Sequence, residues 1–96
     1  MNLENLVREK GKEILRVSRL HGARRVRIFG STGRGEASAT SDLDILVDME
    51  PRSTLLDIVA IKQDLEDMLG CKVDVVTESA LSPYIRQEVL KEAKTL

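Results

Sequence analysis

The run Ile28-Phe29-Gly30-Ser31-Thr32-Gly33-Arg34-Gly35 is followed, after a short polar loop, by Ser41-Asp42-Leu43-Asp44-Ile45-Leu46-Val47. An apolar strand leads into a turn of small residues, and two carboxylates open a second strand. Side chains of a strand alternate between its faces, so Asp42 and Asp44 share one face and the apolar residues share the other. Two neighbouring carboxylates repel each other unless they are solvated or neutralised by a cation. Mg²⁺, a hard ion that prefers oxygen ligands, is the natural candidate.

The size and charge of the chain narrow the possible functions. Its 96 residues predict one domain spanning residues 1–96, and 42% hydrophobic residues are typical of a folded globular protein. A net charge of −1 argues against nucleic-acid binding through bulk charge. The only aromatic residues are Phe29 and Tyr84, too few for a base-stacking platform. Direct nucleic-acid binding is therefore disfavoured.

The single cysteine and the absence of long apolar runs indicate the compartment. Cys71 has no second cysteine to form an internal disulfide, which fits a reducing cytosol. No apolar run approaches the roughly 18 residues of a membrane-spanning helix, and the charged N-terminal region does not resemble a signal peptide. We expect a cytoplasmic protein without a membrane partner.

Periodicity predicts six elements in the order α-β-β-α-β-α. They are helices over residues 3–20, 55–69 and from Pro83 onward, and strands over residues 25–29, 43–49 and 71–77. Thr54 and Asp57 form a capping-box pattern and Gly70 is a stop signal. Ile85, Val89 and Ala93 are the expected buried stripe of the last helix. The predicted fold class is α/β, with a short mixed sheet flanked by helices.

A third carboxylate lies within the third predicted strand. If strands two and three pair, Asp74 lies beside Asp42 and Asp44. Three clustered carboxylates can hold two divalent ions about 3.5–4 Å apart, an arrangement that activates an attacking oxygen and stabilises a leaving one. Asp42, Asp44 and Asp74 are thus the candidate catalytic and metal-ligating residues, and the chemistry indicated is phosphoryl or nucleotidyl transfer.

The turn before the second strand fits a phosphate. Gly30 allows a backbone N–H to approach a phosphate closely, and the Ser31 hydroxyl can donate to the same group. Arg34 could add a charge-assisted contact, although an exposed arginine paired with Glu36 explains it equally well.

Two other features have ordinary explanations. The basic residues Arg24, Arg25 and Arg27 are interpreted as a solvated edge, with contact to a partner as the alternative. Tyr84 is interpreted as a packing residue rather than a substrate.

The pattern of Gly30-Ser31-x-x-Arg34-Gly35, Ser41-Asp42-x-Asp44 and Val73-Asp74-Val75 resembles the nucleotidyltransferase fold of the DNA polymerase beta superfamily. The similarity is greatest to its smallest members, the minimal nucleotidyltransferases. It implies a metal triad at Asp42, Asp44 and Asp74 that uses two Mg²⁺ ions. It also implies an ATP triphosphate held at Gly30 and Ser31.

The resemblance further implies a partner, a toxin with a HEPN ribonuclease domain. Minimal nucleotidyltransferases of this kind act as antitoxins, and they inactivate the toxin by transferring AMP from ATP to a toxin tyrosine. We therefore expect a Mg²⁺-dependent protein adenylyltransferase. Two alternatives stay open: an antitoxin that masks its toxin without catalysis, and nucleotide transfer to RNA or to a small molecule.

Overall fold

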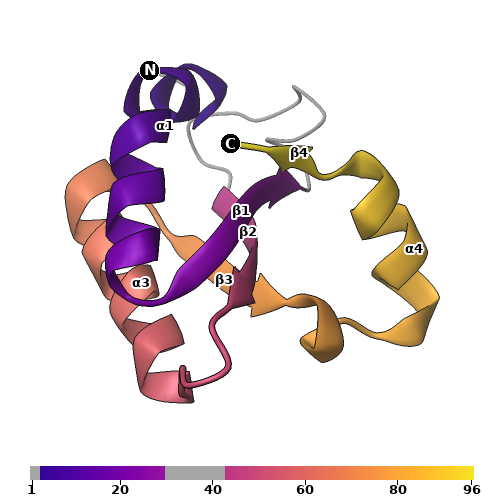
Figure 1. Cartoon of the computed structure of the whole chain (residues 1–96). Coiled ribbons are helices and arrows are strands. Elements are labelled where there is room, and N and C mark those ends of the chain that lie inside the picture. Colours follow the sequence, from indigo (N-terminus) through magenta and orange to yellow (C-terminus); the bar gives the residue numbers. More distant parts are fainter. Residues whose placement is uncertain (1–2, 30–42) are drawn as a thin grey trace.

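A computed structural model describes residues 3–29 and 43–96 of the chain, as four short strands in one sheet with helices on both faces (Figure 1). The elements are α1 (Leu3–Leu20), β1 (Ala23–Phe29), β2 (Leu43–Met49), α3 (Leu55–Leu69), β3 (Val73–Thr77), the 3-10 turn η1 (Glu78–Ala80), α4 (Pro83–Glu92) and β4 (Lys94–Thr95). The predicted order of helices and strands is confirmed, with η1 and β4 as additions. Within the described ranges, no helix combines the length and apolar composition that a bilayer crossing requires.

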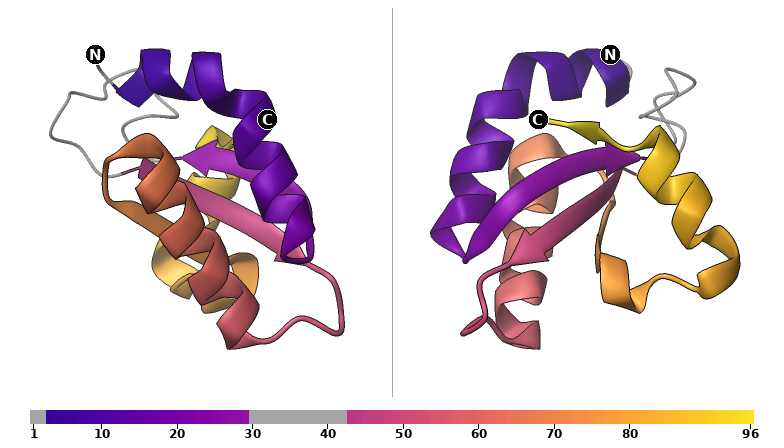
Figure 2. Two further views of the ribbon diagram at one scale, coloured as in Figure 1. Left: turned by 90° about the vertical axis from the view of Figure 1, so that its left-hand side faces the viewer. Right: turned by 45° about the vertical axis from the view of Figure 1, so that its right-hand side comes forward.

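The sheet is mixed, as predicted, with the strand order β3-β2-β1-β4. β1 pairs antiparallel with β2, β2 pairs parallel with β3, and the two-residue β4 pairs antiparallel with β1. The parallel pair requires a crossover, which α3 supplies between β2 and β3. Figure 2 shows α1 and α3 on one face of the sheet and α4 on the other.

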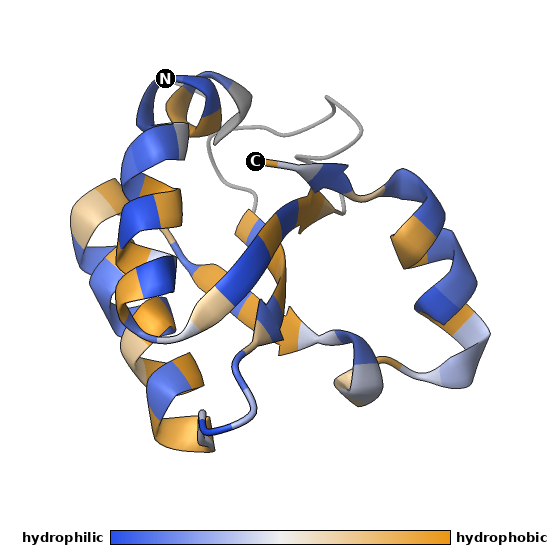
Figure 3. Cartoon of the chain, viewed as in Figure 1, coloured by the Kyte–Doolittle hydropathy of each residue, from blue (hydrophilic) through white to orange (hydrophobic). Residues whose placement is uncertain are grey.

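The main core lies between the sheet and the two helices α1 and α3. Leu43, Ile45 and Val47 of β2 are all fully buried there, on the face that the alternation predicted. Figure 3 shows hydrophobic and hydrophilic residues interleaved along α1 and α3, the pattern of helices with one face against a core. This packing fixes β2 and turns Asp44 toward the opposite face.

A smaller core lies under α4 and makes β2 buried on both faces over part of its length. Leu46 is fully buried, although it lies on the same face as Asp44, because Leu81 and Val89 pack against it. The expected stripe of α4 is only partly confirmed, since Val89 is buried but Ile85 is 48% exposed. Ile85 lies in the first turn of α4, which extends away from the strands (Figure 1).

The ends of α3 follow their local sequence. Thr54 Oγ1 accepts from the Leu56 N–H at 3.2 Å, and the Thr54 N–H donates to Asp57 Oδ2 at 2.8 Å, so the predicted capping box is present. Gly70 ends the helix with φ 69°, a left-handed conformation that glycine adopts without steric cost. Only three residues separate the end of α3 at Leu69 from the start of β3 at Val73, which ties the helix closely to this strand.

Candidate active site

Two carboxylates lie opposite each other on neighbouring strands. Asp44 of β2 pairs with Asp74 of β3 in the parallel register, and Phe29 of β1 is the antiparallel partner of Asp44. Paired residues of adjacent strands place their side chains on the same face. Phe29, Asp44 and Asp74 thus form one row across the sheet, on the face opposite α1 and α3. The pairing of strands two and three, which was a condition of the predicted site, is present, and it brings these two carboxylates together.

Asp42, Gly30, Ser31 and Arg34 lie outside the described residues. Their assigned roles stay predictions.

The described carboxylates fit a hard divalent cation in their donor chemistry. Asp44 is half-buried and Asp74 is exposed, so both lie where a solvated ion can approach. Each supplies carboxylate oxygens, the ligands that Mg²⁺ prefers. Residues 3–29 and 43–96 contain no group of three acids, histidines or cysteines placed to hold a metal ion. A third ligand would therefore come from outside the described residues, where Asp42, the predicted third carboxylate, lies.

Arg27 contradicts the expectation of a solvated basic edge. Its side chain is only 8% exposed, and Nη2 lies 3.5 Å from Asp48 Oδ1 and 4.0 Å from Glu78 Oε2. It faces the side of the sheet that α4 and η1 partly cover, beside its strand partner Leu46. Arg27 is thus a buried, paired structural residue and is unsuited to contacting a partner.

The neighbouring Arg24 and Arg25 are exposed, unlike Arg27. The register of β1 shifts between Ala23 and Arg25, which is a bulge at Arg24. Arg24 pairs with Glu50 at 3.8 Å, whereas Arg25 stays on the same face of the strand as Arg27 but is exposed.

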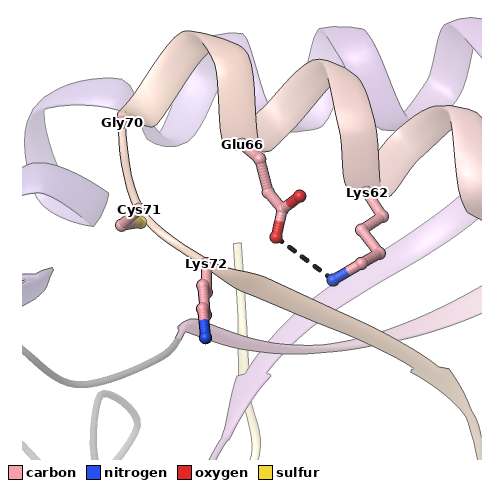
Figure 4. A pocket seen from close by; sticks show the side chains of 5 residues that line it. All are labelled: Lys62, Glu66, Gly70, Cys71 and Lys72. Carbon is pink, nitrogen blue, oxygen red and sulfur yellow. Dashed lines mark hydrogen bonds and ion pairs between the residues drawn. The ribbon is translucent and has the colours of Figure 1, made fainter.

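A polar hollow between α3 and the start of β3 was not foreseen from the sequence. It is lined by Lys62, Glu66, Gly70, Cys71 and Lys72 (Figure 4). Lys62 Nζ donates to Glu66 Oε2 at 3.1 Å and to the Val73 carbonyl at 2.7 Å, and the Val73 N–H donates to Glu66 Oε2 at 3.0 Å. The sequence signal was the Lys-Glu spacing of four residues on one helix face, which indicates an ion pair but not its contact with a strand.

The Val73 N–H and the Lys62 ammonium together lower the pKa of Glu66 below its ordinary value, with the backbone hydrogen bond as the larger cause. Both contacts favour the charged carboxylate. Glu66 is therefore ionised at neutral pH and remains so to a lower pH than an unpaired glutamate.

Comparison with known proteins assigns the family. Residues 10–96 match the family model described as "Nucleotidyltransferase domain". The chain belongs to this family. The nucleotidyltransferase is 45% identical over 71 residues to the protein adenylyltransferase MntA of Thermococcus cleftensis, covering 74% of this chain and 72% of MntA.

Solved structures agree with this assignment. The nucleotidyltransferase is 48% identical to a chain described as a candidate minimal nucleotidyltransferase, with a TM-score of 0.87, covering 100% of this chain and 97% of the other. It also shares its fold with a structure described as a tri-AMPylated Shewanella oneidensis HEPN toxin in complex with MNT antitoxin, at 22% identity and a TM-score of 0.66, covering 97% of this chain and 71% of that one. The expected minimal nucleotidyltransferase fold is confirmed.

Proposed function

We propose that this nucleotidyltransferase is a Mg²⁺-dependent protein adenylyltransferase, an antitoxin that transfers AMP from ATP to a tyrosine of a HEPN-family ribonuclease toxin. The observation that carries the proposal is the pairing of Asp44 with Asp74 on one face of the sheet. Two further facts support it: the relative from Thermococcus cleftensis is named a protein adenylyltransferase, and a protein of the same fold is described in complex with an AMPylated HEPN toxin.

Asp42, Asp44 and Asp74 would hold the metal, with Asp42 and Asp44 as shared ligands and Asp74 on the side of the attacking oxygen. Bound Mg²⁺ would neutralise charge on the triphosphate and on the attacking oxygen. Gly30 and Ser31 would hold the triphosphate, and Arg34 would add a cationic contact.

The transfer itself is a substitution at the α-phosphorus of ATP. A bond forms between the tyrosine oxygen and the α-phosphorus, and the bond from this phosphorus to the oxygen that bridges it to the β-phosphorus breaks. Pyrophosphate leaves with that oxygen, and the phenolic proton passes to the Asp74 carboxylate, which is exposed on the reacting face. Positioning by the partner protein brings the tyrosine oxygen to about 3–3.5 Å from the phosphorus.

The proposal is tested by incubating the protein with ATP, Mg²⁺ and the HEPN-type toxin, followed by mass spectrometry of the toxin. We expect a gain of one or more AMP units on a toxin tyrosine. Asp74→Asn should abolish the gain. Asp67→Asn, the same substitution at an exposed acid of α3, should not.

Three outcomes would contradict the proposal in different ways. A toxin that is inhibited but unmodified would indicate masking without catalysis. Addition of AMP to RNA or to a free small alcohol, with the toxin unmodified, would indicate another acceptor. Full transfer by Asp74→Asn would show that this carboxylate pair is not the catalytic centre.

A further inference from the structure

The outer edge of β3 is closed by side chains of α3. β3 is the edge strand of the sheet, so Val73 has its backbone N–H and C=O directed away from β2, where no strand satisfies them. Glu66 accepts from the Val73 N–H at 3.0 Å and Lys62 donates to the Val73 carbonyl at 2.7 Å. The two side chains are joined at 3.1 Å. Figure 4 shows them side by side on α3, above the start of the strand.

The residue before Val73 is hydrogen-bonded to β2. The Leu43 N–H donates to the Lys72 carbonyl at 2.9 Å, which begins the ladder between β2 and β3. Val73 is therefore held between β2 on one side and the Lys62–Glu66 pair on the other. Asp74 is the next residue, and it lies opposite Asp44.

The carboxylate pair needs such a restraint. Asp44 and Asp74 carry like charges on adjacent strands, and like charges directly opposite each other destabilise a strand pair. β2 is held by packing, because Leu43, Ile45 and Val47 on its apolar face are fully buried under α1 and α3. β3 is paired with a strand on one side only, so the contacts of Lys62 and Glu66 on its outer side add to the burial of the Val73 side chain in the main core. Together they restrain the strand where movement would separate the two carboxylates.

We propose that the Lys62–Glu66 pair is a positioning device that holds the backbone before Asp74, and thereby sets the geometry of the Asp44–Asp74 cation site. The inference rests on the proposed function, in which these carboxylates bind metal. Glu66 and Lys62 touch neither the metal nor the substrate and act only through Val73. The lowered pKa of Glu66, caused mainly by the Val73 N–H, agrees with a firm contact.

Three variants with Mn²⁺ as the probe test this role. Glu66→Ala removes the acceptor for the Val73 N–H, whereas Glu66→Gln keeps an oxygen acceptor there and removes only the charge. Glu13→Ala is the matched control, because Glu13 pairs with Lys10 at 3.7 Å on α1, far from β3 in the chain. Mn²⁺ affinity is measured by calorimetry, hydrogen exchange of the Val73 amide reports whether the contact is lost, and AMP transfer to the toxin gives kcat and KM.

We expect Glu66→Ala to speed hydrogen exchange of the Val73 amide. It should weaken Mn²⁺ binding about tenfold, as the substitution of residues that orient metal ligands typically does. It should also lower kcat and leave the KM for ATP unchanged. Glu66→Gln should retain most of the affinity, and Glu13→Ala should match the wild type. Adding Glu66→Ala to Asp74→Asn should cause no further loss of Mn²⁺ affinity, because the pair acts through Asp74. If Glu66→Ala does not fold, Lys62→Met takes its place, since it removes the contact with the Val73 carbonyl and the ion pair with Glu66 but leaves Glu66 as the acceptor for the Val73 N–H.

Two results would overturn the inference, and they are distinguishable. Faster exchange at Val73 with wild-type Mn²⁺ affinity in Glu66→Ala, while Asp74→Asn has lost binding, would refute the positioning role and leave the proposed function standing. Wild-type Mn²⁺ affinity in Asp74→Asn would refute the metal site itself, and the positioning role with it.

Discussion

Asp44 and Asp74 lie opposite each other in the parallel pairing of β2 and β3, in one row with Phe29 of β1. The pairing is local in space but joins residues separated by the whole of α3. The two carboxylates repel each other, and together they offer oxygen ligands to a cation. Both properties can be measured.

Asp74→Asn should separate metal binding from folding. Removing one of two opposed charges relieves repulsion, so the melting temperature without metal should stay the same or rise. Mg²⁺ at 100 times its dissociation constant should stabilise the wild type by about 2.7 kcal/mol, and this gain should vanish in the variant. Thermal melts with and without Mg²⁺ measure both effects, with Asp67→Asn as the control. A variant that kept the full Mg²⁺ gain would contradict the assignment of Asp74.

Arg27→Glu should destabilise the fold strongly, whereas Arg25→Glu should not. The Arg27 side chain is 8% exposed, and a carboxylate there would be buried beside Asp48 and Glu78, at a cost of about 3–5 kcal/mol. Arg25 lies two residues earlier on the same strand face but is exposed, so its change should stay within about 0.5 kcal/mol. Urea unfolding of both variants tests this. Similar losses would mean that burial does not separate the two arginines.

Gly22→Ala should cost more stability than Gly70→Ala. Gly70 has φ 69°, in the left-handed region that other residues reach at a cost of about 1 kcal/mol, and nothing lies within 4 Å of an added Cβ. Gly22 has φ 97°, farther from that region, and an added Cβ would lie 2.5 Å from Ser53 Oγ, which must rotate away. Denaturant midpoints give the order. Equal costs would show that the turn after α1 relaxes freely.

Acid should remove the contribution of Glu66 to stability. Its pKa is lowered in the folded protein from the ordinary 4.5, so the folded state binds fewer protons there than the unfolded state. The contribution is complete above 4.5 and is lost as the pH falls through the lowered folded value. Glu66→Gln should therefore flatten this part of the stability profile, measured by urea unfolding across the acid range. An unchanged slope below pH 4.5 would contradict it.

Local sequence predicted the ends of elements and the faces of strands well, because both depend on neighbouring residues. The capping box at Thr54 and the left-handed Gly70 determine α3 within a few residues. The alternation around Asp44 placed it opposite the buried face correctly. The pairing of β2 with β3 was a condition of the site hypothesis rather than a deduction, and the register confirms it.

Features that depend on tertiary contacts escaped prediction. β4 is only two residues long and exists because it meets the edge of β1, so no periodicity marks it. Arg27 was expected to be solvated, but its burial depends on η1 and α4 covering that part of the sheet. Tyr84 was expected to pack, yet it is 93% exposed because the first turn of α4 extends past the sheet (Figure 1).

The cover that α4 places over Leu46 has an electrostatic consequence. Leu46 lies two residues after Asp44 on the same face of β2 and is fully buried. Asp44 therefore lies at the boundary between the low-dielectric interior and the solvent. The attraction energy of two opposite unit charges 4 Å apart is about 1 kcal/mol in bulk water but about 4 kcal/mol at the effective dielectric constant near a protein surface. Partly buried charges are also screened less by dissolved salt than exposed ones. Added monovalent salt should therefore weaken cation binding at Asp44 and Asp74 less than it weakens an exposed ion pair such as Lys10–Glu13 on α1.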